Sequence, residues 1–129
     1  MRLLLDTQVL FWVLVEPHRL TPLATDIVGD PANQVYVSAA TAWELSVKHT
    51  LGKLPVAGPV VAGYSAHLVT LRAEELAVTS AHALRAGSYR LHHRDPFDRL
   101  LAAQASLEGL TLVTQDQVFA AFPDLSTIW

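Results

Sequence analysis

Two short apolar runs, each followed closely by an aspartate, constrain the fold of this chain most. Residues 2–5 run directly into Asp6, and residues 110–113 are followed three positions later by Asp116. Short, uninterrupted apolar runs are typical of strands buried on both faces, as in a parallel sheet. Ligands gather beyond the carboxyl ends of such strands. The two runs therefore predict a parallel sheet with two carboxylates at its carboxyl edge.

Helical patterns alternate with the predicted strands along the whole chain. Three further strands are predicted, a weak one at 76–78 and two more at 34–37 and 127–129. Capping residues and apolar spacing predict helices at 7–15, 22–29, 39–51, 60–69, 81–86, 96–108 and 118–122. Such alternation predicts an α/β fold: one domain over residues 1–129, with a mostly parallel, roughly five-stranded sheet in a three-layer α/β/α sandwich.

The composition excludes several classes of function. The chain has 129 residues, of which 51% are hydrophobic, so it can bury a core without disulfides. It has no cysteine, which excludes thiol catalysis and zinc–thiolate sites and favours a cytoplasmic location. A charge follows the first three apolar residues, so we expect no signal peptide and no membrane span. The net charge of −3 argues against binding nucleic acid through a general basic field.

Two more carboxylates flank a proline at the start of the predicted helix 96–108. Pro96 suits the first helical position, because its missing N–H would be unpaired there. Asp95 is then the N-cap and Asp98 lies in the first turn, at the positive end of the helix dipole. A capping role alone explains both residues equally well.

Glu44 lies inside the predicted helix 39–51. Thr41 precedes it at capping-box spacing, and Lys48 follows at the spacing of a surface ion pair, so a structural role is one explanation. The other is that its helix tilts across the sheet edge and brings Glu44 to the aspartates.

A parallel sheet with right-handed crossovers places Asp6, Asp116 and the turn Asp95–Asp98 at one edge. Two carboxylates about 4 Å apart repel by roughly 4 kcal/mol at an effective dielectric near 20, so the cluster needs a counter-charge. An all-oxygen acidic pocket suits Mg²⁺ or Mn²⁺, and bound divalent ions would also offset the negative charge of the chain. The reaction class that uses such a site is phosphodiester hydrolysis.

Four segments carry a resemblance to a known family. Leu-Leu-Leu-Asp6-Thr, Ala-Trp43-Glu44, Arg-Asp95-Pro-Phe-Asp98-Arg-Leu-Leu-Ala-Ala and Leu-Val-Thr-Gln-Asp116 together resemble a PIN domain of the VapC toxin type. The resemblance implies an endoribonuclease that uses Mg²⁺ or Mn²⁺.

In the resemblance the catalytic and metal-binding residues are Asp6, Glu44, Asp98 and Asp116, with Asp95 as a possible further ligand. It also implies an RNA substrate, a homodimer and a cognate VapB-type antitoxin.

Several other residues are candidates for contact with RNA. Arg94 and Arg99 either bind phosphate or balance the acids, and Thr114 either contributes to substrate binding or bonds the backbone. Thr7 presents the same choice between a metal-bound water and the backbone. The remaining candidates favour structural roles: His92 and His93 as solvated loop residues, and Trp12 and Trp43 as core, dimer or antitoxin contacts.

Two other classes of function fit part of the pattern. Phosphotransfer receivers and haloacid-type hydrolases also place an acid after the first strand, but the second class expects Asp where Gln8 stands, and a receiver needs a lysine beyond Lys53. A non-catalytic PIN-like binding module, whose acidic cluster engages arginines of a partner, is the main alternative to a nuclease.

Overall fold

The computed structural model describes all 129 residues and contains one five-stranded sheet. The strand order is β3-β2-β1-β4-β5, and every neighbouring pair is parallel. The strands are β1 (Arg2–Leu5), β2 (Gln34–Ser38), β3 (Ala73–Leu76), β4 (Thr111–Val113) and β5 (Ser126–Ile128). The run Leu3–Leu5 forms the central strand and is fully buried, as its apolar pattern predicts.

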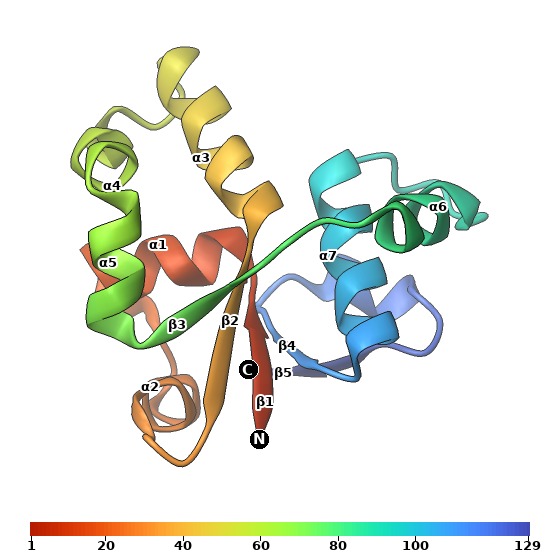
Figure 1. The fold of residues 1–129 in the computed structure, drawn as a ribbon, viewed down its shortest axis with the longest axis horizontal. Helices are drawn as coiled ribbons and strands as arrows, with labels where there is room; N and C mark the ends of the chain where they lie inside the picture. Colours follow the sequence, from red (N-terminus) through yellow and green to blue (C-terminus); the bar gives the residue numbers. More distant parts are fainter.

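Helices cover both faces of this sheet. They are α1 (Thr7–Val15), α2 (Pro22–Gly29), α3 (Ala39–Thr50), α4 (Gly58–Ala62), α5 (Tyr64–Leu71), α6 (Ser80–Ser88) and α7 (Pro96–Glu108), with three 3₁₀ turns, η1 (Pro17–Arg19), η2 (Pro55–Ala57) and η3 (Gln117–Ala121). Figure 1 shows α1 to α5 on one side of the strands and α6 and α7 on the other. The predicted three-layer α/β/α sandwich is confirmed.

Each face of the sheet has its own hydrophobic core, and β1 contributes to both. Leu3 and Leu5 pack with α1 and α3, including Leu10 and Leu45. Leu4 points to the opposite face and packs with α7. This alternation follows from the two-residue period of a strand, and it fixes β1 between the two helical layers.

The third strand is not where its apolar pattern predicted it. The sequence favoured residues 76–78, whereas β3 spans Ala73–Leu76 and includes Glu74 and Glu75. It is an edge strand whose only neighbour is β2, and both glutamates are exposed. A continuous apolar run indicates a strand covered on both faces, so this signal fails at an exposed edge.

The predicted helix 60–69 is also wrong, because two helices occupy this region. Gly63 lies outside the α-helical region at φ −108° and ψ 25°, and it separates α4 from α5. Glycine is a poor helix former, so the helix ends there. The prediction missed this end because the apolar spacing continues on both sides of Gly63.

Smaller corrections affect the ends of elements. The last strand lies one residue earlier than predicted, and residues 117–121 form a 3₁₀ turn in place of a helix. Thr79, not Ser80, caps α6, which continues through Gly87. None of the helices combines the length and apolar character that crossing a bilayer requires.

Candidate active site

A cleft of about 520 Å³ is lined by residues that lie beyond the carboxyl ends of β1 and β4 and at the facing parts of α1, α3 and α7. The sequence candidates from distant parts of the chain come together here. Six of its lining residues are acids: Asp6, Glu16, Glu44, Asp95, Asp98 and Asp116.

Asp6 forms the buried floor of this cluster. It is only 8% exposed, and its backbone N–H donates to Val113 O on the neighbouring strand. The Thr114 hydroxyl donates to Asp6 Oδ2 at 2.7 Å. Burial, together with the negative charges of Glu44 and Asp116, raises the pKa of Asp6 to about 6, although the Thr114 hydrogen bond opposes the shift. The fold therefore holds a carboxylate at a place that disfavours its charge.

Thr114 connects two of the acids. Its hydroxyl donates to Asp6 and accepts a hydrogen bond from the backbone N–H of Asp116 at 3.0 Å. Asp116 is exposed and caps η3 by accepting from the N–H of Val118 at 3.0 Å. One buried hydroxyl thus links the residues that follow the adjacent strands β1 and β4.

Asp98 enters the cleft from the first turn of α7. His93 Nε2 lies 2.7 Å from Asp98 Oδ2, and the two side chains are 28% and 15% exposed. Burial, and to a smaller extent the charges of Asp95, Asp6 and Glu44, raise the pKa of Asp98 to about 6, while the His93 hydrogen bond lowers it.

Asp95 caps α7 as its position predicts. Its Oδ1 accepts from the N–H groups of Phe97 and Asp98 at 2.9 and 3.2 Å. Asp95 is exposed and also lines the cleft. Its side chain therefore caps α7 and is at the same time close enough to the acidic cluster to belong to it.

Glu44 joins the cluster from α3. Ser38, not Thr41, caps this helix, and the Thr41 hydroxyl instead pairs with that of Thr7 at 3.0 Å. The predicted ion pair with Lys48 is present, with 2.7 Å between Nζ and Glu44 Oε2. Glu44 is nevertheless buried, and its Oε1 has no hydrogen-bond partner. A buried carboxylate oxygen without a partner is costly, so its surroundings favour a further cation.

The carboxylates of the cleft are the type of ligand that a hard divalent cation prefers, although they do not surround a common position in the structure. No three of the His, Asp and Glu side chains stand in a geometry that could hold a metal ion. The fit rests on oxygen donors only, on the unpartnered Oε1 of Glu44, and on the repulsion that helps to raise the pKa values of Asp6 and Asp98.

The structure gives Arg99 a role different from RNA binding. Its guanidinium donates to four backbone carbonyls, of His93 (2.9 Å), Ala86 (2.9 Å), Tyr89 (3.0 Å) and Leu91 (3.2 Å). These carbonyls belong to the end of α6 and the loop that precedes α7. Arg99 therefore fixes this loop and has few donors left for phosphate.

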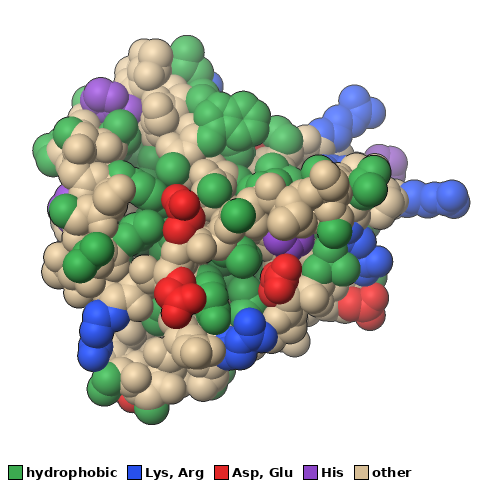
Figure 2. Space-filling view, in the orientation of Figure 1, with side chains coloured by type: hydrophobic (Ala, Val, Ile, Leu, Met, Phe, Trp, Pro, Cys, Tyr) green, Lys and Arg blue, Asp and Glu red, His purple; other side chains and the backbone are tan.

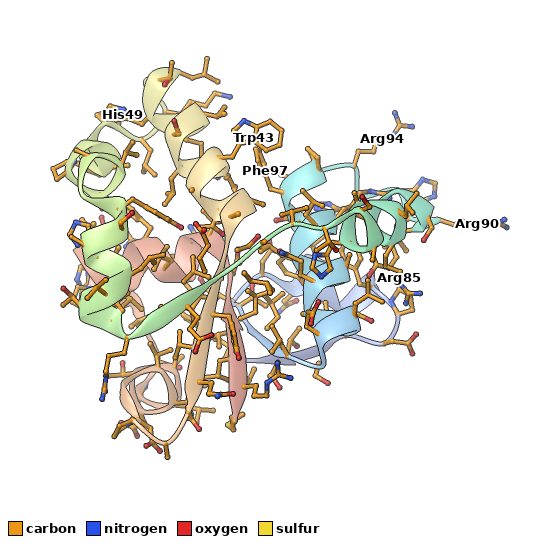
Figure 3. All side chains as sticks on the ribbon, in the orientation of Figure 1. Trp43, His49, Arg85, Arg90, Arg94 and Phe97 are labelled. Carbon is orange, nitrogen blue, oxygen red and sulfur yellow. The ribbon has the colours of Figure 1, made fainter.

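The structure also gives Arg94 and Thr114 surroundings that differ from those expected of substrate-binding residues. Arg94 is exposed, does not line the cleft and projects away from the molecule (Figure 3). The Thr114 hydroxyl is occupied by two acids, so it positions them and is not free for substrate. Among the remaining residues, Trp12 is buried in the core, whereas Trp43 is 58% exposed and packs edge-on against Phe97 at 4.8 Å (Figure 3).

Two functional candidates were not identified from the sequence. Arg19 and Lys53 line the cleft, as does Lys48, whose spacing predicts the ion pair with Glu44. Lys53 lies in the turn after α3 and Arg19 at the end of η1. The only available signal was that both lysines of the chain fall within nine residues of Glu44.

A family model described as PIN domain matches residues 3–125, and the chain belongs to this family. The resemblance carried by the four segments is therefore confirmed. Ribonuclease VapC22 of Mycobacterium tuberculosis is 29% identical over 98% of this chain and 97% of its own length. Ribonuclease VapC16 of the same organism is 36% identical, but the match spans 51% of this chain and only 52% of that relative.

Solved structures agree on the fold. DNA-bound VapBC from Salmonella typhimurium superposes with a TM-score of 0.72 and 18% identity, covering 99% of this chain and 97% of that one. At this identity the likeness establishes the architecture and not the activity.

Proposed function

We propose that the chain is a Mg²⁺- or Mn²⁺-dependent endoribonuclease that acts in the cytoplasm as the toxin of a toxin–antitoxin pair. The observation that carries this proposal is the meeting of Asp6, Glu44, Asp98 and Asp116 in one cleft. The names of the relatives VapC16 and VapC22, both ribonucleases, support the choice of RNA as substrate.

Asp6, Glu44, Asp98 and Asp116 would hold the cation, with Asp95 as a possible further ligand. A bound divalent ion would supply a water of lowered pKa and a counter-charge for the scissile phosphate. The chain itself supplies the placement of the acids. The Thr114 hydroxyl donates to the Asp6 carboxylate and accepts from the backbone N–H of Asp116, and the His93 ring hydrogen-bonds to Asp98. These contacts orient the carboxylates of Asp6 and Asp98.

The proposed partners are a second copy of the chain and a VapB-type antitoxin. Structural neighbours described as VapBC complexes, including those from Salmonella typhimurium and Rickettsia felis, support the second of these. Co-purification of the chain with the product of the adjacent gene is the direct test of that partner.

The activity is tested by incubating the purified chain with structured RNA and Mg²⁺ or Mn²⁺. We expect cleavage by the wild type, and none by Asp6→Asn or Asp98→Asn. Asp26→Asn is the matched control, because Asp26 is exposed on α2 and lies outside the cleft. Equal cleavage by the wild type and both site variants would exclude the proposal.

A non-catalytic binding module remains the second candidate, because no three acids are assembled as metal ligands in the structure. In this alternative the cluster binds arginines of a partner and has no affinity for divalent ions. Calorimetric titration with Mn²⁺ separates the two: binding that Asp116→Asn abolishes supports the nuclease, and no binding supports the module.

A further inference from the structure

Three basic side chains line the same cleft as the acids: Arg19, Lys48 and Lys53. The chain has only two lysines, and both are here. We propose that these three cations hold the phosphate backbone of a single-stranded RNA segment beside the carboxylates, an inference that rests on the proposed nuclease function.

All three cations are accessible to a phosphate. The Arg19 and Lys48 side chains are 54% and 46% exposed, and they pair with Glu16 and Glu44, which lie three and four residues earlier in the chain. The Arg19–Glu16 pair is largely exposed, and such pairs contribute about 0 to 1 kcal/mol, so Arg19 can exchange its carboxylate for a phosphate at little cost. Glu44 is buried, so Lys48 keeps its ion pair and offers its other ammonium protons to a phosphate. Lys53 is exposed and has no ion-pair partner.

Lys48 fixes where this backbone would lie. Its ammonium is 2.7 Å from Glu44 Oε2, so a phosphate bound by Lys48 is a direct neighbour of the acidic cluster. A phosphate held there places the adjoining phosphodiester group of the strand next to the acids.

Arg19 is oriented by an aromatic ring. Its guanidinium carbon lies 5.8 Å from the centroid of Trp12, and both residues line the cleft. Stacking on the ring restricts the guanidinium without using its donors, and the pairing of Nε with Glu16 leaves the N–H groups of Nη1 and Nη2 for phosphate. Cations combined with aromatic side chains are the usual means by which proteins bind single-stranded nucleic acid.

A second group of arginines provides the contrast. Arg90 and Arg94 project from the edge formed by α6 and the loop that follows it (Figure 3), where basic side chains stand out in the space-filling view (Figure 2). Arg85 lies on α6 with its guanidinium carbon 5.4 Å from the centroid of the Tyr89 ring. None of them lines the cleft, and Arg85 pairs with Asp124 at 3.5 Å. They change the net charge as much as the cleft cations do, so they serve as a matched control.

The experiment measures binding separately from cleavage. Each protein carries Asp98→Asn, so that the RNA stays intact, and binds a fluorescein-labelled single-stranded RNA whose anisotropy is followed over a range of NaCl concentrations. One variant combines Arg19→Gln, Lys48→Gln and Lys53→Gln, and the control combines Arg85→Gln, Arg90→Gln and Arg94→Gln. Thermal unfolding midpoints verify that both remain folded.

We expect the cleft variant to bind more weakly and to lose about 2 from the slope of log K against log salt, roughly 0.7 for each phosphate contact on a single strand. The control should keep the parent slope. Equal losses in both variants, or no measurable binding by the parent, would overturn the inference. If the wild type fails to cut RNA but the cleft variant selectively loses binding, the nuclease proposal falls and this assignment stands.

Discussion

Asp6 and Asp98 share the same electrostatic condition but are held by different partners. Both have a pKa of about 6, and burial is the main cause in each. Asp6 is held by Thr114, and both lie directly after the adjacent strands β1 and β4. Asp98 is held by His93, which lies in a loop that is itself fixed by Arg99. The site therefore has two halves: the Asp6 half, which is part of the buried core, and the Asp98 half, which depends on the loop that carries His93.

The largest effect should follow from replacing the acids themselves. We expect Asp6→Asn and Asp98→Asn each to lower the rate of RNA cleavage by more than about 100-fold, because loss of a ligand should exceed the 10–100-fold typical of its supporting partners. Single-turnover cleavage rates with Mn²⁺ measure this. If only one of the two substitutions slowed cleavage, the two aspartates would not act together in one catalytic site.

Next come the partners that position these acids. Thr114→Val and His93→Ala should each slow cleavage by about 10–100-fold, with His93→Gln restoring part of the loss through its side-chain donor. NMR titration of the carboxyl carbons gives the sharper readout. Thr114→Val should raise the pKa of Asp6 more than that of Asp98, and His93→Ala should do the reverse. Equal changes at both acids would remove the distinction between the two halves.

Burial of the charged acids predicts an unusual dependence of stability on pH. A carboxyl group whose folded pKa is raised above 3.8 stabilises the fold below that value, and the contribution is lost as pH rises through about 6. In EDTA, Asp6→Asn should therefore increase the free energy of unfolding by about 2 kcal/mol at pH 8 and by almost nothing at pH 4. Urea unfolding measures both values.

Asp26→Asn is the control for this prediction, since it removes one exposed charge and should leave the free energy of unfolding nearly unchanged at both pH values. A destabilised Asp6→Asn protein at pH 8 would show that burial does not disfavour the charged form of Asp6.

The smallest expected effect concerns the loop that carries His93. Arg99→Lys keeps the charge but cannot reach four carbonyls, so we expect a loss of about 1 to 2 kcal/mol in unfolding free energy. Hydrogen exchange should increase in residues 86–93 and not around Asp6. An unchanged loop would mean that Arg99 does not support the Asp98 half.

The parts of this fold that follow from the sequence are those governed by local pattern. Leu3–Leu5 form the central strand, where both faces are covered and a continuous apolar run is the correct signal. The edge strand β3 was misplaced because an exposed edge tolerates Glu74 and Glu75. Asp95 as cap and Asp98 in the first turn follow from the geometry of a helix start.

The site was predictable only in part, for a similar reason. Asp6 and Asp116 follow strands, so the edge of the sheet fixes their place. Glu44 reaches the cluster only because α3 lies across that edge of the sheet. The direction of a helix relative to a sheet cannot be predicted from a local sequence pattern. The role of Arg99 depends on four carbonyls that only the folded loop brings together.

The central claim, that the converging acids form a divalent cation site, is tested most directly by calorimetric titration of the chain with Mn²⁺ near pH 6. Repeating the titration in two buffers of different ionisation enthalpy counts the protons released. We predict binding with proton release, because Asp6 and Asp98 are partly protonated at this pH and must ionise to coordinate. Both the binding and the proton release should be lost in Asp6→Asn. Binding that Asp6→Asn leaves unchanged, or no binding at all, would contradict the account.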